Sequence, residues 1–81
     1  MMTKNEKKLL NQIKTNTLKL KENGQIPYCL YERILRLNYD SDIQLVTKLK
    51  DLSDKYIRVG GYYHRHPEES DKCELELKNI K

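Results

Sequence analysis

The spacing of apolar residues changes at Tyr56, and this change limits the folds that the chain can adopt. Before Tyr56, apolar side chains recur every three or four residues, the period of an amphipathic helix, at Leu45, Val46, Leu49 and Leu52. After it the period becomes two: polar residues alternate first with Ile57 and Val59, and later with Cys73, Leu75 and Leu77. A helix over 41–55 is therefore expected to lead into two antiparallel strands, 56–64 and 72–80.

A helix over 68–80 is the alternative to the second strand, because Glu and Lys favour helices. The strict alternation of Cys73, Leu75 and Leu77 with charged residues favours the strand. Gly60 and Gly61 interrupt the first strand, which indicates a bulge or bend. The connection HRHPEESD is too charged to be buried, so a β-hairpin over 56–80 is predicted.

The N-terminal half predicts two further helices, 3–22 and 27–37. The first has an apolar stripe of Leu9, Leu10, Ile13, Thr17 and Leu20 and stops at Asn23-Gly24. The second starts at Pro27, since proline suits the first turn of a helix. Ser41, with Gln44 three residues later, is the expected N-cap of the third helix.

The order helix, helix, turn, helix, strand, basic loop, strand resembles the winged helix-turn-helix family. The resemblance is architectural and covers nearly the whole chain, so residues 1–81 are expected to form a single α+β domain. It implies that the third helix enters the DNA major groove and that the wing contacts the backbone or minor groove. The DNA-binding residues implied on this chain are Ser41, Gln44, Thr47 and Lys48 of the helix, and Arg58, His64, Arg65 and His66 of the wing region.

The charge distribution is compatible with an anionic partner. The chain has a net charge of +4 and a pI near 9.1. Residues 1–26 carry six Lys against two Glu, which is +4, and the rest of the chain is balanced. The lysines of 3–22 are either a solvated face or a grip on flanking phosphates. Asp51 and Asp54, and the three acidic residues that follow the basic triplet 64–66, would repel phosphates.

These observations predict a cytoplasmic protein that binds double-stranded DNA, as a transcription regulator or an accessory factor of a mobile element, plasmid or phage. A homodimer is expected, because 81 residues cover only a short site. The alternative is a protein-binding module that docks on a partner protein, since tyrosines anchor interfaces well. Its anchors would be Tyr28, Tyr31, Tyr39, Tyr62 and Tyr63.

No motif of an enzyme is present: there is no Gly-rich phosphate loop, metal-binding helix or nucleophile elbow. We therefore expect no catalysis and no cofactor. Cys29 and Cys73 are expected to be reduced, partly buried thiols. A zinc site formed by these cysteines with His64 and His66 is a weaker alternative. The chain has no apolar run of membrane-spanning length and no signal-peptide pattern.

Overall fold

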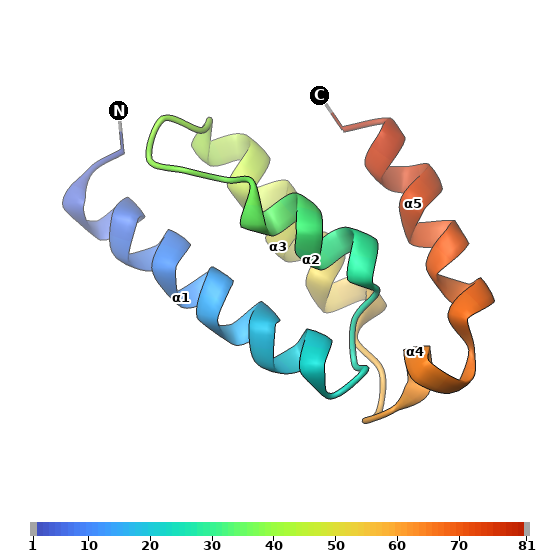
Figure 1. The fold of residues 1–81 in the computed structure, drawn as a ribbon. Coiled ribbons are helices and arrows are strands. Elements are labelled where there is room, and N and C mark those ends of the chain that lie inside the picture. Colours follow the sequence, from blue (N-terminus) through green and yellow to red (C-terminus); the bar gives the residue numbers. More distant parts are fainter. Residues whose placement is uncertain (1, 81) are drawn as a thin grey trace.

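The computed structural model describes residues 2–80, and within that range it contains helices, turns and loops but no strand. Five α-helices and one 3₁₀-helix follow one another along the chain (Figure 1). They are α1 (Lys4–Glu22), α2 (Tyr28–Leu35), α3 (Ile43–Tyr56), α4 (Tyr62–Arg65), the 3₁₀-helix η1 (Pro67–Glu69) and α5 (Ser70–Lys78). The fold is all-α.

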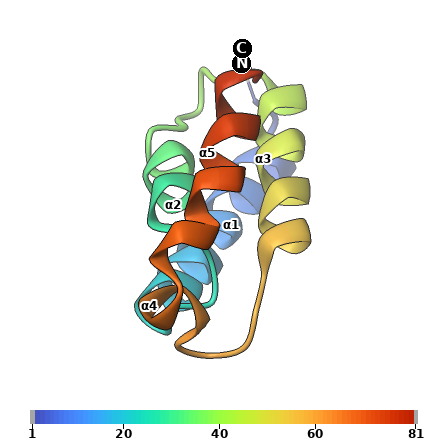
Figure 2. The same ribbon diagram turned by 90° about the vertical axis from the view of Figure 1, so that its right-hand side faces the viewer.

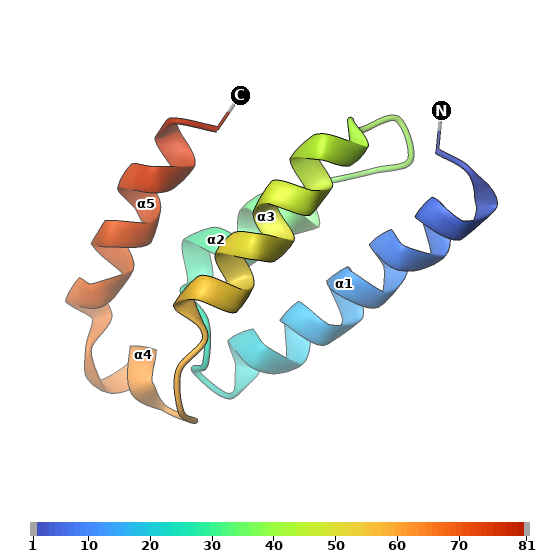
Figure 3. The same cartoon turned by 180° about the vertical axis from the view of Figure 1, so that it is seen from behind.

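α2 is the central helix of the bundle, because it packs against α1, α3 and α5. α1 and α5 lie at opposite edges, with α2 and α3 between them (Figures 1 and 3). Turned by a quarter, the molecule shows α5 lying across α2 and α3 on the side away from α1 (Figure 2). Both ends of the described chain lie at one end of the bundle, and α4 lies at the other (Figure 1).

The core is aliphatic and small. Its fully buried side chains come from all the long helices and from the turn before α2; they include Leu10, Ile26, Leu30, Ile34, Val46, Leu49 and Cys73. Tyr56 and Tyr63 complete it near α4, each 9% exposed. With no Trp or Phe in the chain, tyrosine rings supply the large aromatic surfaces of this core.

The three N-terminal helices are confirmed, with small changes at their ends. Thr3 and Glu6 form a capping box at the start of α1, where each side chain accepts a hydrogen bond from the other residue's backbone N–H. α3 is capped by Asp42 and not by Ser41 as expected: the Asp42 carboxylate accepts from the N–H of Gln44. The hydroxyl of Ser41 instead accepts from the N–H of Asn38 in the preceding turn.

The predicted hairpin over 56–80 is wrong, and with it the α+β fold class and the winged-helix architecture. Cys73, Leu77 and Ile80 face the core at helical spacings of four and three. Leu75, which produced the apparent alternation with Cys73 and Leu77, is 62% exposed on the outer side of α5. The apparent alternation of apolar and polar residues therefore arose because Leu75, which faces outward, lies between the helical core positions Cys73 and Leu77.

Gly61 also has a different role from the predicted strand bulge. Its left-handed backbone, with φ of 81°, precedes the first turn of α4, a conformation that glycine adopts cheaply. The turn before α2 and the segment after α3 are joined by three backbone hydrogen bonds. The donors are the N–H groups of Arg58, Gly61 and Tyr63, and the acceptors are the carbonyls of Gln25, Asn23 and Gly24. The three N–H donors lie in the segment 56–64 that was predicted to be a strand. They bond to the turn before α2 and so are not available for a hairpin.

Candidate nucleic-acid interface

The residues predicted to contact DNA do not form one surface. Ser41, Gln44, Thr47 and Lys48 lie at the N-terminal end of α3, whereas Arg58 and residues 64–66 lie beyond its C-terminal end. Residues 49–56, the last eight of α3, lie between Lys48 and the segment that carries Arg58, and eight helical residues span roughly 12 Å. The groups are therefore at opposite ends of the molecule (Figure 1).

Several of these predicted residues are already engaged in local contacts. The hydroxyl of Thr47 donates to the carbonyl of Ile43 within its own helix, at 3.0 Å. The guanidinium of Arg58 donates to the carbonyls of Lys55 and Ile57, at 3.1 and 2.8 Å. Such contacts hold a side chain against the backbone, so neither residue projects freely towards a partner.

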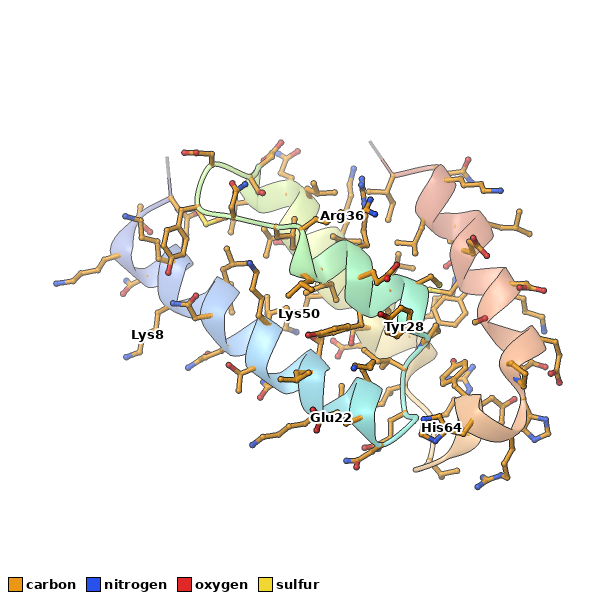
Figure 4. All side chains as sticks on the ribbon, viewed as in Figure 1. Lys8, Glu22, Tyr28, Arg36, Lys50 and His64 are labelled. Atoms are coloured by element: carbon orange, nitrogen blue, oxygen red, sulfur yellow. The ribbon has the colours of Figure 1, made fainter. Side chains whose placement is uncertain are left out.

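The basic triplet 64–66 is exposed on α4 and the residue after it. Nδ1 of His66 lies 3.5 Å from a carboxylate oxygen of Glu68. His64 lies against the turn before α2, where its ring would meet a side chain placed on Gly24 (Figure 4). The triplet is thus part of a short helical corner and not the tip of an extended wing.

The outer side of α1 is the most basic surface of the molecule. α1 contains six lysines and two glutamates, a net charge of +4 that equals the charge of the whole chain. Leu10, Ile13 and Thr17 face the core, so the opposite arc of the helix is exposed. That arc, called the α1 face below, consists of Lys4, Lys8, Asn11, Gln12, Thr15 and Lys19; Figure 4 shows Lys8 on it, projecting away from the other helices.

The lysines of α1 are not neutralised by carboxylates. Among residues 2–80, the four ion pairs within 4.0 Å involve Lys50, Lys55, His66 and Lys72, none of them in α1. Glu6 is turned back to the N-cap by its hydrogen bond with Thr3. Glu22 is the single acidic residue on the exposed side, and it is the last residue of the helix.

Two further lysines of α1, Lys7 and Lys21, lie over tyrosine rings of α2 and of the loop that follows it. Nζ of Lys7 is 5.2 Å from the centre of the Tyr39 ring, and Nζ of Lys21 is 5.6 and 5.1 Å from the rings of Tyr28 and Tyr31. These are cation–π distances. The hydroxyl of Tyr39 also exchanges hydrogen bonds with the amide of Asn11. The contacts orient the lysines while leaving their charge uncompensated.

The opposite edge of the molecule is acidic. Residues 67–80, which contain η1 and α5, carry five acidic residues against Lys72 and Lys78, which is 2 − 5 = −3. Because α1 and α5 occupy opposite edges (Figure 3), the molecule has one positive and one negative side. A polyanion would be attracted to the first and repelled by the second.

An open, mainly apolar groove of about 340 Å³ separates α3 from α5. Leu52 and Ile80 supply its apolar wall, and the ion pair between Lys55 and Glu76, at 2.6 Å, crosses its edge. Hydrogen bonding from Lys55 lowers the pKa of Glu76, so its carboxylate stays charged near neutral pH. Among residues 2–80 no three His, Cys, Asp or Glu side chains come together as metal ligands.

The tyrosines proposed as protein-docking anchors are dispersed. Tyr28 and Tyr39 are well exposed, at 59% and 42%, but both lie under lysines of α1. Tyr63 is buried in the core. Tyr62 packs on Tyr63 and His66 near α4. The five rings therefore do not make one patch.

Comparison with protein-family models, curated proteins and solved structures finds no match to this chain. Across residues 2–80, the structure has no helix with both the length and the apolar character needed to cross a membrane.

The α1 face was not among the DNA-binding residues predicted from the sequence. The charge excess of residues 1–26 was the available signal, and it pointed to this helix. The lysines were expected to have at most a supporting role, because the winged-helix resemblance implied contacts by the third helix and the wing. The lysines of α1 lie on an outer edge because α2 is the central helix of the bundle. Which helix is central is decided by the packing and cannot be read from the charge pattern.

Proposed function

We propose that the protein binds double-stranded DNA through the α1 face. The observation that supports this most directly is that the entire net charge resides on one exposed edge helix, whose lysines form no ion pair with any residue from 2 to 80. DNA affinity comes largely from Lys and Arg that displace condensed counterions. The structure thus supports the same partner as the sequence did, at a different surface.

The shape of α1 is suited to a DNA groove. The helix has 19 residues and is about 28 Å long, and a helix fits the major groove, which is about 12 Å wide. Lys4, Lys8 and Lys19 would contact phosphates. Gln12, in the middle of the α1 face, is the residue type that pairs bidentately with adenine, so it is our candidate for base contact.

The third helix is less suited to this role. α3 contains Lys48, Lys50 and Lys55 against Asp51 and Asp54, and two of these lysines are paired with carboxylates. The acidic residues of η1, Glu68 and Glu69, directly follow the predicted wing residues, and η1 packs against α4. Phosphates would meet a nearly neutral α3 and an acidic α5.

The proposal is tested with two triple variants that carry the same total charge. One is Lys4→Gln, Lys8→Gln, Lys19→Gln on the α1 face; the control is Lys48→Gln, Lys72→Gln, Lys78→Gln on α3 and α5. All six lysines are exposed, and both variants change the net charge from +4 to +1. In gel-shift titrations with a mixed-sequence duplex, we expect the α1 variant to lose about tenfold or more in affinity and the control about threefold or less.

Equal losses in the two variants would show that only net charge matters, and a larger loss in the control would contradict the α1 face and point to α3 or α5 as the binding surface. No retardation of the duplex by the unmodified protein at low salt would reject DNA as the ligand. Capture of a protein partner that survives high salt would then favour the docking-module alternative. Circular dichroism of all three proteins establishes that the variants keep their helices.

A further inference from the structure

The two cysteines, 44 positions apart in the sequence, meet between α2 and α5. Cys29 is in the first turn of α2 and Cys73 is in α5, and the two helices pack against each other. Sγ of Cys29 lies 3.9 Å from the carbonyl oxygen of Ser70, one helical turn before Cys73. Both cysteines are free thiols, and Cys29 packs against the core cluster that contains Cys73.

The two thiols differ in access and in acidity. Cys73 is completely buried, whereas Cys29 is partly exposed at the edge of the same core cluster. The hydrogen bond from the Cys73 thiol lowers the pKa of Cys29, because it stabilises the Cys29 thiolate. The same hydrogen bond and burial raise the pKa of Cys73. Cys29 is thus the accessible nucleophile, and Cys73 is positioned to react after it.

We propose that Cys29 and Cys73 form an oxidation site, at which a low-molecular-weight disulfide converts the two thiols into a disulfide between α2 and α5. This inference goes beyond the proposed DNA binding and is independent of it. The packing of α2 on α5, with Cys29 in contact with the backbone one turn before Cys73, would supply the close approach that a disulfide requires.

The reaction occurs in two exchanges. The Cys29 thiolate attacks one sulfur of the small disulfide, forming a mixed disulfide and releasing one small thiolate, which takes up a proton. The Cys73 sulfur then attacks Sγ of Cys29, and its proton passes to the departing small thiolate, which leaves as the second small thiol. Overall, the two protein thiols lose two electrons and two protons, and the small disulfide gains them as two thiols.

The bond would fix α5 to the rest of the molecule. Outside η1, α5 makes its main helix contact with α2, so one covalent link at this contact anchors the whole C-terminal segment. The link closes a loop of about 45 residues in the unfolded chain, a length at which disulfides stabilise proteins substantially. Oxidation should therefore raise the thermal midpoint by on the order of 10 °C.

The test is to incubate the reduced full chain with oxidised glutathione, quench in acid, and measure intact mass, free thiols and the thermal midpoint. We expect a monomer that is lighter by two hydrogen atoms, has no free thiol and melts at the higher temperature. A lasting glutathione adduct on the unmodified protein, a disulfide-linked dimer, or two free thiols after prolonged incubation would each overturn the proposal.

Variants distinguish the two roles. In Cys73→Ala, the reaction should stop at a mixed disulfide on Cys29. In Cys29→Ala, Cys73 should form a mixed disulfide at no more than about a tenth of the rate at which Cys29 does. If a variant does not fold, brief alkylation of the folded unmodified protein gives the same information, because Cys29 should be labelled first. Labelling of Cys73 before Cys29 would contradict the assigned order.

Discussion

At the scale of single residues, two tyrosines show how polar groups are accommodated in a small core. The hydroxyl of Tyr63 donates to the backbone carbonyl of Tyr56 at 2.6 Å, in a buried hydrogen bond that ties α4 to the end of α3. Tyr56 is itself buried, and Glu76 of α5 lies beside it. Burial first, and then the Glu76 carboxylate, raises the pKa of Tyr56 to about 12.

This raised pKa predicts a loss of stability in alkaline solution. An exposed tyrosine in the unfolded chain releases its proton near pH 10, whereas folded Tyr56 keeps it until about pH 12. Unfolding therefore releases a proton between these values, so the free energy of unfolding falls as the pH rises from 10 to 12. Below pH 10 the contribution of Tyr56 is fully present.

Tyr56→Phe removes this contribution. Urea denaturation of both proteins at several pH values should show that the difference in free energy of unfolding between unmodified protein and variant shrinks as the pH rises above 10. A constant difference from pH 8 to 12 would mean that Tyr56 titrates normally in the folded protein.

At the scale of elements, α5 shows which helices the sequence predicts and which it does not. α1 and α3 were predicted because their apolar stripes are long and their caps are local: Asn23-Gly24 ends one, and a polar capping residue begins the other. In α5 and just after it, the core positions Cys73, Leu77 and Ile80 were obscured by Leu75. Which leucine faces outward depends on packing against α2, and no local rule contains that information.

Two leucine variants separate the helix from the rejected strand. In a hairpin Leu75 and Leu77 would share one face, so truncating either would cost similar stability. Of the two leucines of α5, Leu77 packs against the core and Leu75 does not. We expect Leu75→Ala to change the free energy of unfolding by about 0.5 kcal/mol or less, and Leu77→Ala to lower it by roughly 1–3 kcal/mol. Urea denaturation gives both values; equal costs would support the hairpin.

At the scale of the whole molecule, charge separation is the dominant feature. A helix with a net charge of +4 forms one edge, and the segment 67–80, with −3, forms the other. The sequence revealed the amount and position of this charge along the chain. It did not reveal that the two segments lie at opposite edges, because that depends on α2 occupying the centre.

The salt dependence of DNA binding should report this arrangement. If Lys4, Lys8 and Lys19 contact phosphates, the logarithm of the association constant should fall with the logarithm of salt concentration with a slope of about −3. In the Lys4, Lys8, Lys19 triple variant the magnitude of the slope should drop by about 2–3, and in the α3 and α5 control it should change by less than about 1. Filter-binding measurements between low and moderate salt would provide these slopes; a slope that is shallow in the unmodified protein would exclude the proposed contacts.

The position of the two chain ends has a mechanical consequence. Residues 2 and 80 leave from the same end of the bundle, one from each outer helix (Figure 1). Tension applied between them would pull α1 and α5 apart sideways, and would not slide the helices past one another along their axes. The helix contacts would therefore separate one turn at a time. Pulling with optical tweezers should therefore open the molecule gradually from this end at low force, with the paired turns near α4 separating last.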